Sequence, residues 1–172
     1  ISDYPVGLDA IYLQNFRRKF PSLESYVTPR KILALIVTTD RMPVRMICAI
    51  VGIDNYVFRS FKETIGSILI ETKRPVGVDG AECISYSFCH KSVRDWIINS
   101  DKSGRYYVDV ATAYGTVADY YRLNISKQYI PEDEIVTVDD YLKNYIQSNI
   151  IDVYSKLSKW NEVESFLLEE DT

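Results

Sequence analysis

The chain has 172 residues, of which 47% are apolar, 26% charged and 13% aromatic. Because it can bury enough apolar surface to offset the loss of chain entropy on folding, a disordered or low-complexity chain is excluded. Its longest apolar runs, residues 32–37 and 46–51, are far shorter than the about 20 residues that a membrane-spanning helix needs, so no membrane partner is expected. The net charge of −4 divides into +4 for residues 1–130 and −8 for residues 131–172, and the pI near 5.1 argues against a nucleic-acid-binding protein.

The first two predicted helices are separated by a short connection. Residues 7–20 place apolar side chains near one helical face and end on a basic run, which suits the helix dipole, before Pro21. Thr28 and Pro29 then predict an N-cap and a first-turn proline for a second helix that extends to about residue 39.

Two more helices and a hairpin follow. Pro43 precedes a helix over residues 44–51, which Gly52 is expected to end in a left-handed conformation, and Asp54 is expected to cap a helix over about residues 56–69. Residues 68–70 and 83–88 predict two strands around a turn-rich connection. Short helices followed by a hairpin are the order of a winged helix, in which a helix-turn-helix precedes the wing.

The remaining chain is predicted to be helical, with apolar stripes in residues 91–99, 110–121, 138–157 and 160–168. These helices would form a small bundle with an acidic solvent face. The expected fold class is therefore mainly α with a small β-hairpin, a winged helix followed by a helical bundle.

No catalytic or metal-binding motif is recognisable. The sequence lacks a GxxxxGK(S/T) phosphate loop, GxGxxG, HExxH and GxSxG, and its single histidine cannot build a multi-histidine metal site. The odd set Cys48, Cys83 and Cys89 contains no CxxC pair, which indicates a reducing compartment such as the cytoplasm. The chain begins at Ile1 without a signal peptide, and we expect it to be a non-enzymatic segment of a longer protein.

The predicted helix-turn-helix also raises the hypothesis of a DNA-binding transcription regulator. Its second helix offers only Arg59 and Lys62 against Glu63, and the predicted wing adds Lys73 and Arg74. This is a small supply of positive charge for phosphate contacts, so nucleic acid is not the favoured partner. A structural adaptor that binds a partner protein through its helical part is a further alternative.

The run from Phe88 to Trp96 contains the only histidine, His90, where a strand is expected to enter a helix. An imidazole at such a junction can donate a hydrogen bond to a phosphate. The alternative is a core histidine, bonded to a backbone carbonyl, that holds the strand to the helix.

This region resembles the end of the winged-helix domain in NACHT-type STAND nucleotide triphosphatases, the signal-transducing switch ATPases. The resemblance rests on the run His90-Lys91-Ser92-x-Arg94-Asp95-Trp96-Ile97 and on Gly104-x-Tyr106-Tyr107-Val108-Asp109. Upstream, the resemblance includes Pro5-x-Gly7-Leu8-Asp9-x-Ile11-Tyr12 and Met42-Pro43-Val44, and downstream it includes residues 141–157 and Lys159-Trp160-Asn161-Glu162-Val163.

The resemblance implies a regulatory segment of a larger signalling ATPase. Residues 1–24 would be a helix at the end of the nucleotide-binding lid, residues 25–108 the winged helix, and residues 109–172 a helical connector. His90 would contact the β-phosphate of ADP and hold the closed state. Cys89 and Lys91 replace the methionine and aspartate of the Met-His-Asp motif of plant and apoptotic relatives, so contacts of that aspartate do not transfer, and Lys91 would face either phosphate or water.

The same resemblance implies the partners. ATP or ADP would be bound by the intact protein and not by this segment alone. An upstream nucleotide-binding domain and downstream sensor repeats of the same chain would be the neighbours, and the intact protein would oligomerise on activation. No catalytic residue, metal ligand or cofactor is expected within the segment itself.

Overall fold

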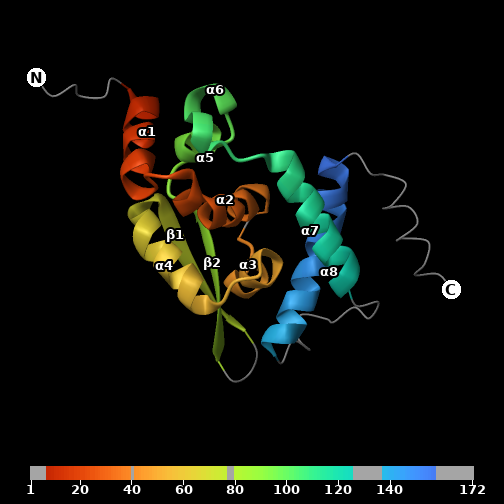
Figure 1. The fold of residues 1–172 in the computed structure, drawn as a ribbon. Coiled ribbons are helices and arrows are strands. Elements are labelled where there is room, and N and C mark those ends of the chain that lie inside the picture. Colours follow the sequence, from red (N-terminus) through yellow and green to blue (C-terminus); the bar gives the residue numbers. More distant parts are fainter. Residues whose placement is uncertain (1–6, 40, 77–79, 126–136, 158–172) are drawn as a thin grey trace, which may run out of the picture.

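The computed structural model describes residues 7–39, 41–76, 80–125 and 137–157. These residues are mostly helical, with one two-stranded antiparallel hairpin (Figure 1), which confirms the prediction of a mainly α chain with a small hairpin. No helix in these ranges is both long and apolar enough to cross a membrane. The elements in chain order are α1 (Leu8–Lys19), α2 (Leu23–Thr38), α3 (Val44–Val51), α4 (Asn55–Ile65), η1 (Gly66–Ile68), β1 (Leu69–Val76), β2 (Ala81–Phe88), α5 (Lys91–Ile97), α6 (Ser100–Ser103), η2 (Gly104–Tyr106), α7 (Val110–Asn124) and α8 (Val138–Lys156).

Helix α2 begins earlier than predicted. Ser22, not Thr28, is its N-cap: the Ser22 hydroxyl accepts from the Ser25 backbone N–H at 3.1 Å, and the Ser25 hydroxyl accepts from the Ser22 N–H at 3.2 Å. This reciprocal cap satisfies two backbone donors, and Pro29 is accommodated inside the helix. The boundary expected between residues 24 and 25 therefore falls within the first turn of α2.

Helices α3 and α4 begin close to their predicted positions. Gly52 ends α3 with φ 73° and ψ 40°, the left-handed conformation that favours glycine. The Asp54 carboxylate accepts from the Val57 backbone N–H at 2.8 Å and caps α4. Helix α4 ends at Ile65, four residues before the predicted end, and η1 leads directly into β1.

The hairpin is longer than predicted, with eight residues in each strand and a register from Leu69↔Phe88 to Val76↔Ala81. An isolated bridge between Pro43 and Ser85 joins the start of α3 to β2. The hairpin is thereby held against the helices.

Helix α2 lies at the centre of the core and packs against α3, β2 and α7, while α8 packs along α7. In Figure 1, α7 and α8 lie side by side on one flank of α2 and α3, opposite α1 and α4. The buried side chains of these elements form one contiguous apolar cluster. An aromatic group within it includes Phe16, Tyr26, Trp96 and Tyr106.

The chain between β2 and α7 contains two α-helices and the 3-10 helix η2 where one helix was predicted. Helix α5 ends at Ile97, and Asn99 caps the short α6 by accepting from the N–H groups of Asp101 and Lys102. Asp109 caps α7 in the same way. The helix predicted over residues 160–168 lies outside the described residues.

The hairpin and α4 are linked through Glu71 on β1. Its carboxylate accepts hydrogen bonds from the Lys62 ammonium on α4 and from the Tyr86 hydroxyl on β2, and the Lys62 ammonium lies 5.3 Å from the Tyr86 ring centroid. The hydrogen bond from Lys62, followed by that from Tyr86, lowers the pKa of Glu71 from its ordinary value of 4.5. The folded state therefore favours the ionised carboxylate.

This link predicts a loss of stability in acid. Because the pKa of Glu71 is lower in the folded chain, its contribution is present above about pH 4.5 and declines as the pH falls through the folded-state pKa. Glu71→Gln should therefore destabilise the chain at pH 7 and differ progressively less from the parent below pH 4.5. Urea denaturation across pH 7 to 3 measures this, with Glu63→Gln on α4 as the control for net charge. A difference between Glu71→Gln and the parent that does not shrink in acid would contradict the prediction.

Candidate functional site

His90 lies at the junction of β2 and α5, where its backbone is extended with φ −149° and ψ 142°. Its side chain caps α5: Nδ1 accepts from the Ser92 backbone N–H at 3.1 Å. His90 is exposed, so the alternative of a core histidine bonded to a carbonyl is wrong. The histidine instead stabilises the start of the helix from its surface.

Two hydroxyls reinforce the position of this ring. The Ser92 hydroxyl lies 2.7 Å from His90 Nδ1, and the Tyr12 hydroxyl of α1 lies 2.6 Å from Ser92 Oγ. Since Nδ1 accepts from the Ser92 N–H, the neutral ring carries its proton on Nε2. Nε2 has no hydrogen-bond partner among the described residues, and its N–H is therefore available to an external acceptor.

Lys91, the second predicted site residue, is exposed in the first turn of α5. It lines a pocket of about 410 Å³ that His90 does not line. The structure thus places these neighbours in different surroundings: Lys91 lines the pocket with Arg94 of the same helix, whereas His90 is hydrogen-bonded to Ser92, which in turn is bonded to Tyr12.

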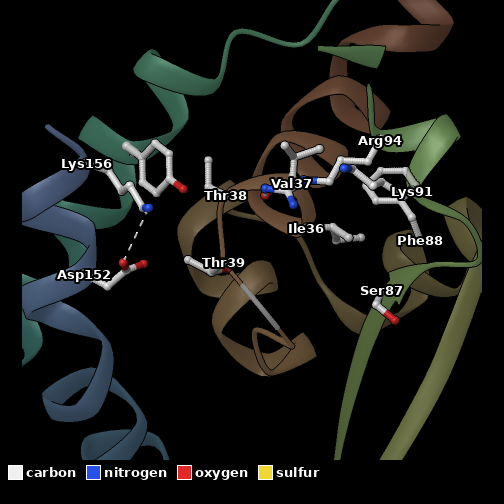
Figure 2. Close-up of a pocket in the computed structure, with 11 residues that line it drawn as sticks. Ile36, Val37, Thr38, Thr39, Ser87, Phe88, Lys91, Arg94, Asp152 and Lys156 are labelled. Carbon is white, nitrogen blue, oxygen red and sulfur yellow. Dashed lines mark hydrogen bonds and ion pairs between the residues drawn. The ribbon is translucent and has the colours of Figure 1, made fainter. Parts of the chain in front are cut away.

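The pocket lies between α2, the end of β2, α5, α7 and α8 (Figure 2). Two cations from α5, Lys91 and Arg94, and one from α8, Lys156, line it together with a single carboxylate, Asp152. Sequence reasoning did not find this group because its members come from elements far apart in the chain. The described residues that line it are Ile36, Val37, Thr38, Thr39, Ser87, Phe88, Lys91, Arg94, Tyr114, Asp152 and Lys156.

The thiols and carboxylates of the described residues do not gather into a metal site: no group of three or more histidine, cysteine, aspartate or glutamate side chains could hold an ion there. Cys48 and Cys83 are buried free thiols, and burial raises the pKa of each. Cys89 is exposed beside His90.

Comparison with known proteins adds no relative: neither protein-family models, nor curated proteins, nor solved structures gave a match to this chain.

Proposed function

We propose that this chain is a non-catalytic regulatory part of a NACHT-type STAND nucleotide triphosphatase, in which His90 contacts the diphosphate of ADP. The nucleotide is bound by a domain upstream in the same protein, and the contact holds the closed state. The observation that supports this proposal best is the exposed imidazole of His90, with Nδ1 engaged by Ser92 and Nε2–H available. A neutral imidazole of this tautomer donates a hydrogen bond to a phosphate oxygen without needing a second proton.

The proposal includes a winged helix, and the order of elements supports it. Helices α3 and α4 are joined by the short turn Gly52 to Asp54, as in a helix-turn-helix, and the β1–β2 hairpin follows in the position of a wing. His90 directly follows the second strand of this hairpin. In this interpretation, closure of the winged helix over the nucleotide brings His90 to the diphosphate.

The helices after Asp109 act in this proposal as a joint that relays movement of downstream sensor repeats. Helix α7 packs against α2 and α3, and α8 packs along α7. Val117 and Tyr121 of α7 and Ile150 of α8 belong to the same buried cluster as α2. A displacement of α8 would consequently disturb α2, which also contacts β2. The intact protein would be a cytoplasmic signalling ATPase that oligomerises on activation.

A DNA-binding function has less support, because two of the four cations considered for it are engaged. Lys62 pairs with Glu71, and Lys73 pairs with Glu82 at 3.0 Å. A titration with duplex DNA at low salt tests the alternative: sequence-dependent binding with a steep salt dependence would favour it.

The test of the proposed contact is ADP retention by the longer protein that contains this chain. His90→Asn should keep the cap of α5, because asparagine is a good N-cap residue, but should lose the imidazole Nε2–H. A coupling of about 1–3 kcal/mol corresponds to a roughly 5- to 150-fold faster ADP release, measured with a labelled nucleotide in a chase experiment. His90→Ala should release ADP as fast and should also be less stable, by about 1 kcal/mol, because it loses the cap.

The paired variants separate the two roles of the histidine. Fast release in both variants, with destabilisation only in His90→Ala, supports the contact. Release at the parental rate from His90→Asn would show that His90 is only a helix cap and would reject the proposal. The absence of a phosphate loop upstream of Ile1 in the encoded protein would reject it as well.

A further inference from the structure

The pocket between α5 and α8 has a lining that is rich in donors and poor in acceptors. Arg94 donates from one guanidinium nitrogen to the Val37 carbonyl at 3.2 Å, which orients the side chain and leaves its other N–H groups available. The Lys91 ammonium and the Ser87 hydroxyl have no hydrogen-bond partner among the described residues. Three donor groups on one side of the pocket are therefore available to a ligand that accepts hydrogen bonds.

The opposite side adds a further cation. Figure 2 shows Lys156 and Asp152 of α8 across Thr38 and Thr39 from Arg94 and Lys91. Asp152, the only carboxylate among the described lining residues, lies 3.9 Å from the Lys156 ammonium. With three cations and one carboxylate, the lining residues that the structure describes carry a net charge of +2. Such a surface attracts an anion and disfavours a cation.

The threonine hydroxyls at the end of α2 are not available to donate to an anion in the pocket. The Thr38 hydroxyl donates to the carbonyls of Ala34 and Leu35, and the Thr39 hydroxyl donates to that of Leu35. Both hydroxyls are satisfied within the helix. The donors left for a ligand are those of the charged residues, Ser87 and Tyr114.

Apolar and aromatic side chains complete the lining. Ile36 and Val37 are buried, and Phe88 and Tyr114 are half-buried. Burial raises the pKa of Tyr114, the Asp152 carboxylate raises it further, and Arg94 lowers it, so the phenol stays protonated and is a donor at neutral pH. A volume of about 410 Å³ falls within the range of about 300–1,000 Å³ that is typical of small-molecule sites.

We propose that this pocket binds a small organic anion, with a carboxylate or phosphate group toward Lys91 and Arg94 and a planar apolar body against Phe88 and Tyr114. The ligand would contact α5, β2, α7 and α8 together and would stabilise the position of α8 relative to α5. This inference does not depend on the proposed contact of His90 with ADP, because His90 is not part of the lining.

Four probes test the proposal by calorimetric titration of the full chain. Naphthoate and naphthyl phosphate combine the planar body with the two anionic groups, naphthamide has the body without charge, and inorganic phosphate is the anionic group alone. We expect saturable binding of at least one of the two naphthyl anions. Naphthamide, which lacks the charge, and inorganic phosphate, which lacks the apolar body, should each bind at least about tenfold more weakly, since a loss of about 1.4 kcal/mol corresponds to a factor of ten.

Matched lysine variants locate the binding. Lys91→Gln should weaken the tighter anion about tenfold, and Lys156→Gln, across the pocket from the anionic group, should weaken it less. Lys102→Gln should leave binding unchanged: Lys102 is an exposed lysine that pairs with an aspartate, as Lys156 does, but it lies outside the pocket. Circular dichroism and urea denaturation check that each variant is folded. Equal binding of naphthamide, equal effects of Lys91→Gln and Lys102→Gln, or no saturable binding of either naphthyl anion would overturn the proposal. Preference for naphthyl phosphate over naphthoate would identify a phosphate ligand, and the reverse a carboxylate.

Discussion

Replacing Trp96 with alanine is expected to lower the free energy of unfolding by about 3–5 kcal/mol, the usual range for truncation of a large aromatic side chain in a core. Trp96 is only 1% exposed, and its ring centroid lies 4.9 Å from that of Phe16 and 5.8 Å from that of Tyr12. It therefore connects α5 to α1. Removal of the indole leaves a cavity between two helices whose positions are fixed by other contacts.

Helix α1 cannot collapse freely into that cavity. Tyr12 is hydrogen-bonded to Ser92, and the Lys19 ammonium donates to the Thr64 carbonyl at 2.6 Å. Asp9 pairs with Lys102 at the other end of the helix. Because the cost of a cavity depends on how far its surroundings relax, we expect Trp96→Ala to lie in the upper part of the range.

The measurement is the midpoint and slope of urea denaturation, with Tyr56→Ala as the control. Tyr56 is an aromatic residue of α4 that is 80% exposed, and its truncation should change stability by no more than about 0.5 kcal/mol. Equal effects of the two substitutions would show that Trp96 is not a core residue.

A second variant, Trp96→Phe, separates packing from polarity. The indole Nε1 is buried and has no hydrogen-bond partner among the described residues. Phenylalanine removes this unsatisfied N–H and keeps a ring against Phe16, so the variant should be clearly more stable than Trp96→Ala. Equal stabilities of the two variants would indicate that ring packing contributes little.

The sequence was most informative where a boundary depends on one residue. Pro43, Gly52 and Asp54 predicted the start of α3, the end of α3 and the cap of α4, respectively. The fixed φ of proline, the left-handed φ that glycine tolerates and the side-chain acceptor of aspartate each act on the backbone within one turn of the chain. Hydrophobic spacing likewise indicated the buried face of α8, where Ile146, Ile150 and Val153 are buried.

The errors arose where two local signals compete or where the partner is distant. Thr28 and Pro29 resemble a helix start, yet the reciprocal bonds of Ser22 and Ser25 begin α2 earlier, and central packing of α2 outweighs one missing backbone donor. Strand β1 continues through Lys73, Arg74 and Pro75, which do not resemble a strand, because β2 supplies the pairing.

The two candidate sites, His90 and the cationic pocket, also differ in how far local sequence patterns could predict them. His90 could be singled out because it is the only histidine and lies at a junction that local patterns define. The cationic pocket was not recognised because Lys91, Arg94 and Lys156 line the same pocket only in the folded chain, where α5, α8 and the end of α2 border it. Its existence depends on tertiary packing, for which no local pattern is a guide.

The packing of α8 predicts a large difference between two adjacent isoleucines. Ile150 is 3% exposed and belongs to the core cluster, whereas Ile151 is 48% exposed. Ile150→Asp would place an uncompensated charge in the core, which costs about 3–5 kcal/mol, whereas Ile151→Asp should stay within about 0.5 kcal/mol of the parent. The chemical change is the same in both variants, so differences in helix propensity and net charge cancel.

Urea denaturation followed by far-ultraviolet circular dichroism measures the pair. Because small domains are stable by only about 5–15 kcal/mol, Ile150→Asp should also increase the fraction of unfolded or dissociated α8 and expose apolar surface to a dye such as ANS. Equal stabilities would mean that α8 does not dock through the face that contains Ile150, and the joint between α8 and α2 would then be absent. An effect confined to Ile150→Asp supports the register of α8 on which both the relay and the cationic pocket depend.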